Sequence, residues 1–250
     1  MKIRLDAELV RRELARSREQ ASDLIEARSV LVNGIPATKP ATMVDAETSI
    51  KLHGKRDDFV SRGGHKLAGA LDAFSGVVVE GKRCLDAGAS TGGFTDCVLQ
   101  RGATHVVALD VGHGQLHPKI RDDERVTVME RFNVRDMTID DIGGEVDVVV
   151  ADLSFISLTL VVPALIGVCR PGSELVLLVK PQFEVGRRDV SKGKGIISDP
   201  ELHQVACDGV RESCENAGAT VNQIISSPIT GAEGNKEFLL YATVREKISV

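Results

Sequence analysis

Two lysines and two acidic residues stand where apolar segments begin or end. Asp152 closes the apolar run VDVVVAD, and Lys180 closes the run ELVLLVK. Lys66 opens a helical stretch in SRGGHKL, and Glu237 opens the run EFLLYATV. Active sites of open α/β sheets lie at the carboxyl ends of the strands, so Asp152 and Lys180 are expected at one edge. Amines beside carboxylates suit general acid–base chemistry. Each of these residues alone could simply be a solvent-exposed end of its element, but the occurrence of all four together argues against that interpretation.

A glycine-rich loop, CLDAGASTGGFT, joins an expected strand to a helix. Gly88, Gly92 and Gly93 lie where the chain turns sharply and where a ligand would come too close for a Cβ atom. The spacing is not the G-x-G-x-x-G of dinucleotide dehydrogenases, and no Gly-Lys-Ser/Thr follows as in a P-loop. Asp86 closes the strand before the loop, and Asp110 closes the next one, where a carboxylate accepts from ribose hydroxyls. The loop therefore predicts an adenosine-containing cofactor.

Strands and helices alternate from Arg83 onward. Helices are expected at Thr91–Gln100, Leu158–Val168 and Pro200–Ala217. Strands are expected to end at Asp86 and to cover His105–Asp110, Val126–Met129, Val146–Asp152, Glu174–Lys180, Val221–Ile225 and Glu237–Val244. Near-continuous Val, Leu and Ile runs are typical of a parallel sheet with helices on both faces, so the predicted fold class is α/β.

A small basic module precedes this region. Residues 1–66 hold 13 Lys and Arg against 10 Asp and Glu, although the whole chain has a net charge of -5. Asp6 is expected to cap a helix through Ala15, and Ser17 with Gln20 forms a capping box for a second helix ending near Ala27. A strand and an Asn-Gly turn follow. The faces away from the apolar stripes carry Arg4, Arg11, Arg12, Arg16, Arg18 and Arg28.

These arginines allow two interpretations, an anion-binding surface or two solvated helix faces. The order of helix, helix, strand, turn and strand in ARSREQASDLIEARSVLVNG resembles the alpha-L RNA-binding motif of a small-subunit ribosomal protein over residues 3–53. The resemblance implies that the arginines face RNA phosphates, which fix the register of binding without reading the base sequence.

The composition limits the remaining classes of function. The chain has 250 residues, 42% of them hydrophobic and 27% charged, as in soluble globular proteins. Aromatic residues make up only 3%, which argues against an aromatic base-stacking platform. Five scattered cysteines without a C-x-x-C pair indicate thiols in a reducing cytoplasm. The apolar stretch Leu158–Cys169 is too short to cross a bilayer, and His113 with His117 lacks a third metal ligand, so no membrane contact and no metal are expected.

Several motifs together resemble one enzyme family. Lys66, Asp152, Lys180 and Glu237 match the Lys-Asp-Lys-Glu tetrad of FtsJ-like ribose methyltransferases. CLDAGASTGGFTD, VVALDVGHGQL, VVADLSFISL and LVKPQFEVG resemble the TlyA family, which methylates cytidine 2′-oxygens of ribosomal RNA and has also been labelled haemolysin A. The resemblance covers nearly the whole chain. It implies a Rossmann-like class I methyltransferase sheet and ribosomal RNA in ribosomal subunits as the partner.

The resemblance also implies S-adenosyl-L-methionine as the cofactor. Lys180 would be the catalytic base and Asp152 would orient it, while Lys66 and Glu237 would hold the ribose. The residues leave open whether Lys66 or the carboxylates govern the charge of Lys180. Asn133 falls where that fold contacts adenine. The implied cofactor-binding residues are Asp86, Gly88, Ser90, Thr91, Gly92, Gly93, Asp110, Asn133 and Asp152.

We expect an RNA-binding domain at residues 1–53, a linker at 54–63 and a methyltransferase domain at 64–250. Members of the family carry Arg-Ala-Trp-Val in the linker, whereas this chain has Asp57-Asp58-Phe59-Val60, so cofactor affinity or domain coupling could differ. Arg187 and Arg188 lie in a glycine-containing basic loop after Lys180 that suits either RNA phosphates or plain solvent exposure.

Three other functions compete with ribose methylation. A haemolysin-like membrane-active protein is disfavoured because no membrane-length apolar segment or strongly amphipathic basic helix is present. A non-catalytic RNA-binding assembly factor would not need the complete set of four charged residues. An NAD-dependent oxidoreductase would more usually show the dehydrogenase glycine spacing.

Overall fold

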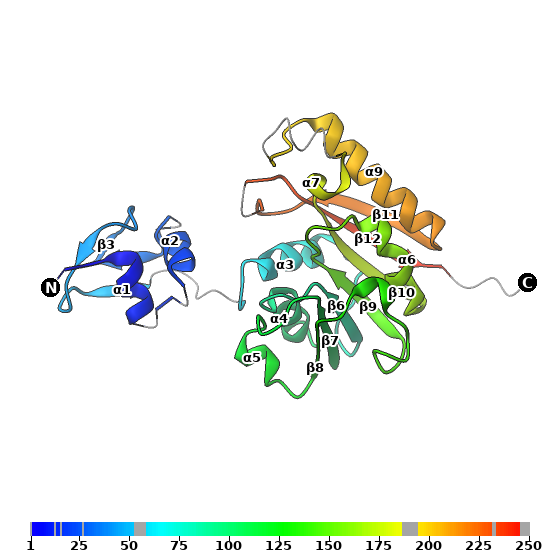
Figure 1. Ribbon diagram of the computed structural model, residues 1–250, viewed down its shortest axis with the longest axis horizontal. Coiled ribbons are helices and arrows are strands. Elements are labelled where there is room, and N and C mark those ends of the chain that lie inside the picture. Colours follow the sequence, from blue (N-terminus) through cyan, green and yellow to red (C-terminus); the bar gives the residue numbers. More distant parts are fainter. Residues whose placement is uncertain are drawn as a thin grey trace, which may run out of the picture. The chain divides into compact units, whose positions relative to one another are not determined.

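The computed structural model describes residues 2–12, 14–15, 17–26, 28–52, 59–186, 195–231 and 234–245. The chain divides into two compact units, Met1–Asp58 and Phe59–Val250 (Figure 1). Val60 is buried in the larger unit, where its backbone amide donates to Oδ2 of Asp96 at 2.7 Å. Part of the segment expected to be a linker therefore packs as the first portion of the larger unit.

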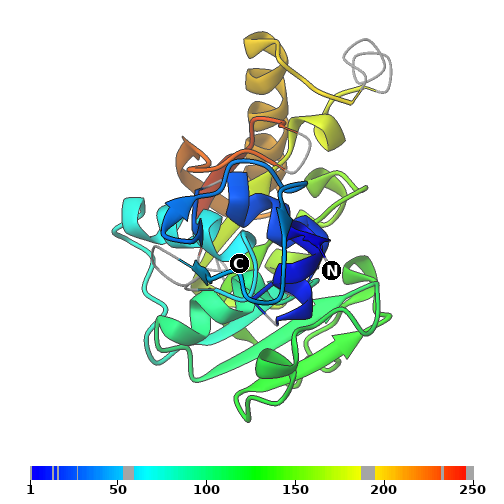
Figure 2. The same ribbon diagram turned by 90° about the vertical axis from the view of Figure 1, so that its left-hand side faces the viewer.

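The smaller unit packs two helices against short strands (Figure 2). β1 pairs antiparallel with β4, and β2 pairs antiparallel with both β3 and β5. The apolar faces of both helices meet in its core, where Leu5, Leu9 and Ile25 are fully buried. Its elements are β1 (Ile3–Arg4), α1 (Leu5–Arg11), α2 (Arg18–Glu26), β2 (Val30–Val32), β3 (Ile35–Pro36), β4 (Met43–Val44) and β5 (Ile50–Leu52).

The helix starts in this unit agree only in part with the expected caps. The Ser17 hydroxyl accepts from the Gln20 amide at 3.1 Å, which confirms the predicted cap of α2. The predicted Asp6 cap is wrong, because Asp6 lies inside the first turn of α1 and the N-cap residue of this helix is Arg4. Asp6 is buried and accepts hydrogen bonds from arginine side chains, so its carboxylate stabilises the core of the unit instead of the helix end.

The larger unit is built on a seven-stranded sheet within the described residues. The strand order is β11-β12-β10-β9-β6-β7-β8, and β12 runs antiparallel to both neighbours while the other pairs are parallel. The expected parallel sheet is therefore wrong for β12, because only residues 227–237 connect it to β11, and so short a connection suits an antiparallel pair. The strands are β6 (Arg83–Ala87), β7 (His105–Asp110), β8 (Val126–Glu130), β9 (Val146–Ala151), β10 (Cys169–Val179), β11 (Ala219–Ser226) and β12 (Phe238–Val244).

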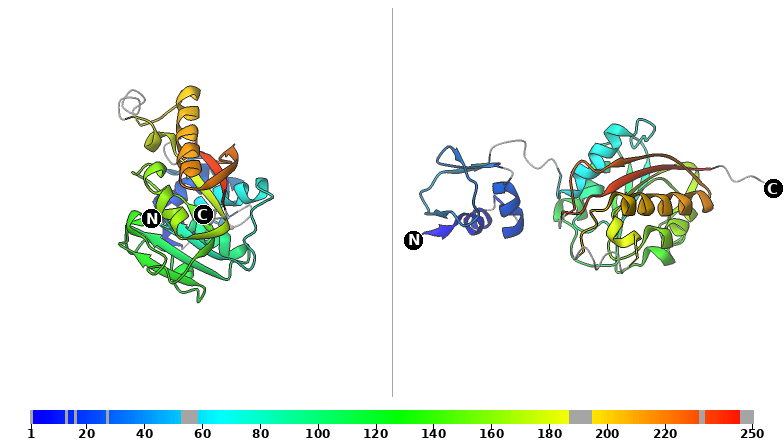
Figure 3. Two further views of the ribbon diagram at one scale, coloured as in Figure 1. Left: turned by 90° about the vertical axis from the view of Figure 1, so that its right-hand side faces the viewer. Right: turned by 90° about the horizontal axis from the view of Figure 1, so that it is seen from above.

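Helices cover both faces of this sheet (Figures 1 and 3). Val148 and Val150 of β9 pack in one core with α3 (Gly63–Ala73), α4 (Gly93–Gln100) and α5 (Pro118–Arg121). Val149 and Ala151 alternate to the other face and pack in a second core. That core includes the 3-10 turn η2 (Leu158–Leu160), α6 (Val162–Gly167) and α9 (Pro200–Asn216). Two short elements follow strand ends, η1 (Val134–Asp136) and α7 (Pro181–Glu184).

Two helices differ from their expected limits for identifiable reasons. α4 begins at Gly93, two residues late, because Gly92 has a left-handed φ of +93° and cannot be part of the helix. The expected helix Leu158–Val168 is divided into η2 and α6. Pro163 lies in the first turn of α6, where the missing backbone N–H would have no helical acceptor in any case. In the interior of one long helix the same proline would remove a hydrogen bond, so the helix is interrupted before it.

The topology gathers the site at one edge of the sheet. β6, β9 and β10 are parallel neighbours, so their carboxyl ends lie together. β12 is antiparallel to β10 and Phe238 pairs with Val179, so the amino end of β12 reaches the same edge. Asp152, Lys180 and Glu237 each adjoin one of these ends.

Candidate active site

Two short ion pairs join the four charged residues predicted from the sequence. Nζ of Lys180 lies 2.6 Å from Oδ1 of Asp152, and Nζ of Lys66 lies 2.6 Å from Oε2 of Glu237. The Glu237 side chain is 3% exposed and that of Lys66 11%, so this pair is almost completely buried. The structure therefore places each lysine beside a carboxylate from a different part of the chain.

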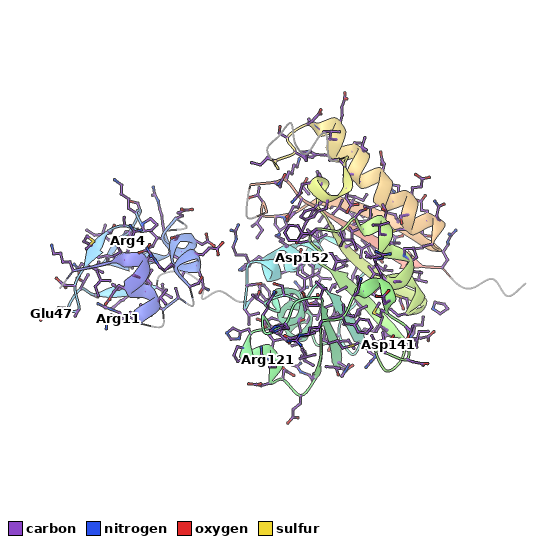
Figure 4. All side chains as sticks on the ribbon, viewed as in Figure 1. Arg4, Arg11, Glu47, Arg121, Asp141 and Asp152 are labelled. Carbon is purple, nitrogen blue, oxygen red and sulfur yellow. The ribbon has the colours of Figure 1, made fainter. Side chains whose placement is uncertain are left out.

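A pocket of about 230 Å³ joins the two pairs. Lys66, Asp152 and Lys180 all line this pocket. Glu237 does not line it, but its carboxylate is ion-paired with Lys66. The labelled Asp152 in Figure 4 marks this region of the larger unit. Two amines and a carboxylate thus face one small space from α3 and from the ends of β9 and β10, an arrangement suited to activating a hydroxyl group.

A second pocket, of about 540 Å³, adjoins the first. Both pockets are lined by Gly88, Ser90, Asp152 and Ser154. The second pocket combines apolar walls with the Asp110 carboxylate, and its size suits a small-molecule cofactor. Further lining residues are Leu109, Val111, Gly112, Gln115, Phe132, Asn133, Val134, Leu153, Phe155 and Ile156.

Asp110 is fixed in this pocket by backbone amides. Oδ2 accepts from the Ser90 amide at 2.8 Å, and Oδ1 accepts from the Gly112 amide at 2.7 Å. Each carboxylate oxygen has a further lone pair that can accept from a ligand hydroxyl. These hydrogen bonds hold the glycine-rich loop and the end of β7 together around the Asp110 carboxylate.

Replacing Asp110 with asparagine should weaken binding of S-adenosyl-L-homocysteine. The substitution points an amide NH₂ at a backbone donor or at the ligand hydroxyls, and loss of a hydrogen bond to a charged group costs about 2 kcal/mol. The dissociation constant from isothermal titration should rise about 30-fold. Asp123→Asn, which changes a carboxylate bonded to Arg125, is the control and should leave it unchanged. Equal affinity in both variants would exclude Asp110 from the binding set.

The structure divides the predicted cofactor-loop residues into two groups. Thr91 and Gly93 line the smaller pocket, and Ser90 and Gly88 line both. Gly92 lines neither of the two pockets in the described part of the chain, and a Cβ there would meet Leu116 and Ile120 at 3.0 to 3.1 Å. Gly92 is therefore required by its left-handed backbone and by helix packing.

Asp86 also lies outside both described pockets. Its side chain is fully buried, and Oδ2 accepts from the Thr95 hydroxyl at 2.6 Å. Burial raises the pKa of Asp86 to about 7, and the nearby Asp152 carboxylate adds to the shift, while the Thr95 hydrogen bond opposes it. Asp86 thus fastens the end of β6 to α4 behind the glycine loop, instead of facing a ligand directly.

Four of the arginines predicted to bind RNA make internal ion pairs in the smaller unit. Arg4 and Arg18 both donate to Oδ2 of Asp6. Arg11 and Arg12 donate to Glu8, and these hydrogen bonds lower the pKa of Glu8 to about 2. The labels on Arg4 and Arg11 in Figure 4 mark this unit.

Arg12 differs from the others, and its predicted role as an RNA contact needs correction. Its guanidinium donates to Glu8 and to the carbonyls of Asp45, Ala46 and Thr48. Because its guanidinium N–H groups bond within the unit, Arg12 connects α1 to the turn before β5. Arg28 is exposed and has a left-handed φ of +56°. Arg16, Arg187 and Arg188 lie outside the described residues.

Substituting Arg12 with alanine should loosen the smaller unit. The change removes three carbonyl partners and one carboxylate partner, which we expect to lower the local opening free energy by about 2 kcal/mol. Amide hydrogen exchange in the full-length protein should become about 30-fold faster in peptides covering α1 and residues 43–52. Lys39→Ala, at an exposed position, should leave exchange unchanged. Unaltered exchange in the Arg12 variant would contradict this structural role.

Several residues around the site had no signal in the sequence. Ser61, Ser154 and Thr230 line the smaller pocket, and Ser154 accepts from Nζ of Lys180 at 2.9 Å. Only the adjacency of Ser154 to Asp152 could have pointed to it. Among the described residues, no three His, Cys, Asp or Glu side chains could hold a metal ion, and no helix has the length and apolar character needed to cross a membrane.

Comparison with known proteins gives two family matches. Residues 59–243 match the FtsJ-like methyltransferase model, and residues 3–50 match the S4 domain model.

Three similar proteins illustrate the range of names in this group. The 16S/23S rRNA (cytidine-2'-O)-methyltransferase TlyA of Mycobacterium tuberculosis is 52% identical over 95% of this chain and 88% of its own. Hemolysin A of Brachyspira hyodysenteriae is 43% identical over 96% of this chain and 99% of its own. A solved structure of a candidate hemolysin from Streptococcus thermophilus is 40% identical, with a TM-score of 0.78, over 98% of this chain and 90% of its own.

Proposed function

The chain belongs to the TlyA group of the FtsJ-like methyltransferase family, and on this premise we propose that it methylates a cytidine 2′-oxygen of ribosomal RNA. S-adenosyl-L-methionine is the methyl donor. The observation that carries the proposal is the convergence of Lys66, Asp152 and Lys180 on a pocket that adjoins a cofactor-sized one. A positioned amine at that junction is what a weakly nucleophilic ribose hydroxyl requires.

The donor set of the larger pocket fits an adenosine-containing group. Asp110 offers carboxylate oxygens to ribose hydroxyls, and Asn133 lies among apolar side chains that suit a purine ring. Gly88 has a φ of +88°, and a Cβ there would come within 2.6 Å of the Asp152 carbonyl oxygen, so the loop needs glycine to reach the strand end. When bound, S-adenosyl-L-methionine supplies an electrophilic methyl group.

Lys180 is proposed as the group that accepts the ribose proton. In its neutral form the amine would take the proton from the 2′-hydroxyl, so that the O–H bond breaks and an N–H bond forms, and the oxygen becomes able to accept a methyl group. Asp152 stabilises the resulting ammonium across a distance of 2.6 Å. Lys66, held by Glu237, places a second cation at the ribose and thereby positions the substrate.

RNA binding is proposed for residues 1–53, the alpha-L module, which precedes a methyltransferase domain that begins at Phe59. We expect the other arginines singled out in the sequence to contact phosphates, while Arg12 supports the module from within. This set consists of Arg4, Arg11, Arg16, Arg18, Arg28, Arg187 and Arg188.

A cytoplasmic location is part of the same proposal. Ribosomal subunits are found there, and all five cysteines are buried and free, as suits a reducing compartment. Burial raises the pKa of Cys84, Cys97, Cys169 and Cys214 to about 12, which keeps these thiols unreactive.

Incubation of purified ribosomal subunits with a labelled methyl donor tests the proposal. We expect label on a cytidine 2′-oxygen, located by mass spectrometry of nuclease fragments. Subunits from cells lacking the enzyme provide the unmodified substrate. A parallel liposome-leakage assay addresses the haemolysin names, and we expect no leakage. Leakage without RNA methylation would refute the proposed function.

A further inference from the structure

The amine of Lys180 has a second partner besides Asp152. Its Nζ donates to the hydroxyl oxygen of Ser154 at 2.9 Å. Ser154 lines the ion-pair pocket and also the larger pocket, so it stands at their junction. Unlike Glu237, which does not line the ion-pair pocket, Ser154 lies on the surface that substrate and cofactor would share.

The residue after Ser154 has an unusual backbone conformation. Phe155 has a left-handed φ of +65°, which is unfavourable for a bulky side chain. This residue is 92% exposed, and one edge of the site is marked by its ring, which lies 5.4 Å between centroids from that of Phe183 of α7. Nζ of Lys180 itself lies 5.9 Å from the centre of the Phe183 ring. Lys180 therefore lies between the Ser154 hydroxyl and the Phe183 ring.

Two partners define the orientation of an amine more completely than one. The nitrogen is tetrahedral, with one position used by the bond to Cε. Asp152 and Ser154 occupy two more positions, at 2.6 and 2.9 Å. A single position remains, and when both partners accept from N–H groups of the neutral amine, the lone pair occupies it. Without Ser154, the lone pair could point in either of two directions.

We propose that Ser154 is a positioning residue that turns the Lys180 lone pair toward the ribose hydroxyl. The inference rests on the proposed function, because it assumes that Lys180 accepts the substrate proton. The hydroxyl proton passes from the ribose oxygen to Nζ, and the Ser154 oxygen accepts a hydrogen bond from Nζ both before and after the transfer. Ser154 gains or loses no proton in this step.

Ser154→Ala tests this role in the full-length enzyme under single-turnover conditions. We expect the rate of methyl transfer at saturating RNA to fall about tenfold, since one hydrogen bond and one orientational constraint are lost. The KM for ribosomal subunits and the affinity for S-adenosyl-L-homocysteine should stay within about twofold of the original. Ser154→Thr keeps the hydroxyl and should recover most of the rate.

Ser157→Ala is the matched control. Ser157 lies on the same turn and donates to Glu184 at 2.6 Å, but it lines neither described pocket. Its loss should lower thermal stability and leave the transfer rate unchanged. An unchanged rate in Ser154→Ala, or an equal fall in both alanine variants, would overturn the inference while wild-type methylation stands. Absence of methylation by the wild type would instead refute the proposed function.

Discussion

Replacing Lys180 with alanine should abolish detectable methyl transfer to ribosomal subunits while the protein still binds S-adenosyl-L-homocysteine. The reason is positional, because Nζ of Lys180 is paired with Asp152 and lines the pocket where the hydroxyl must enter. Loss of a positioned general base typically costs 10²- to 10⁴-fold, so we expect a fall of roughly a thousandfold in the single-turnover rate. Filter binding of labelled RNA measures transfer, and calorimetry measures ligand affinity.

The Lys180 result depends on two comparisons. Lys180→Arg keeps a positive charge but cannot act as a base at neutral pH, so it should be as inactive as the alanine variant. Lys82→Ala alters a lysine beside the amino end of β6, at the opposite edge of the sheet from the site, and should retain full activity. Activity in Lys180→Arg would show that charge alone suffices. Activity in Lys180→Ala would remove Lys180 from the mechanism.

The central fold could be predicted because its strands are long apolar runs. His105–Asp110 was expected with both limits as the structure has them, and every residue of β9 except Asp147 is buried. The direction of β12 could not be predicted, because a strand has the same pattern of apolar residues whether it runs parallel or antiparallel to its neighbours. The division between η2 and α6 depends on Pro163, because proline fits the first turn of a helix but not its interior.

The candidate site followed from residue types at strand ends, because topology alone brings such ends together. Partners within the smaller unit could not be predicted in the same way. Asp6 was expected to cap a helix, yet Asp6 and the neighbouring Glu8 are both buried and ion-paired with arginines. Ion pairing depends on side-chain directions in three dimensions, and Arg12 reaches carbonyls 33 to 36 residues away. No local spacing encodes that contact.

Ser154 and Asp86 illustrate the same limit in the larger unit. Asp86 was expected at the cofactor because of its place in the glycine loop motif, but its side chain points to Thr95 in the interior. Ser154 had no distinguishing neighbour except Asp152, and only coordinates reveal its hydrogen bond to Lys180. Motif position therefore predicted which backbone segments meet, but not which side chains face the pocket.

Breaking the Lys66–Glu237 pair should destabilise the protein as well as inactivate it. Lys66→Met leaves a carboxylate that is 3% exposed without its cation, and such a loss costs about 3 to 5 kcal/mol. For a unit of this size we expect the unfolding midpoint to fall by about 10 °C. Differential scanning calorimetry measures the midpoint, and single-turnover methylation should fall at least about a hundredfold.

A double variant separates the two effects. Lys66→Met combined with Glu237→Gln removes both charges, so the unfolding midpoint should recover most of the loss because no unpaired buried charge remains. Methylation should stay as low as in the single variant, since the cation at the ribose is still missing. Recovery of activity together with stability would mean that the pair only supports the fold. A double variant as unstable as Lys66→Met would show instead that packing around Lys66, and not its charge, stabilises this edge of the sheet.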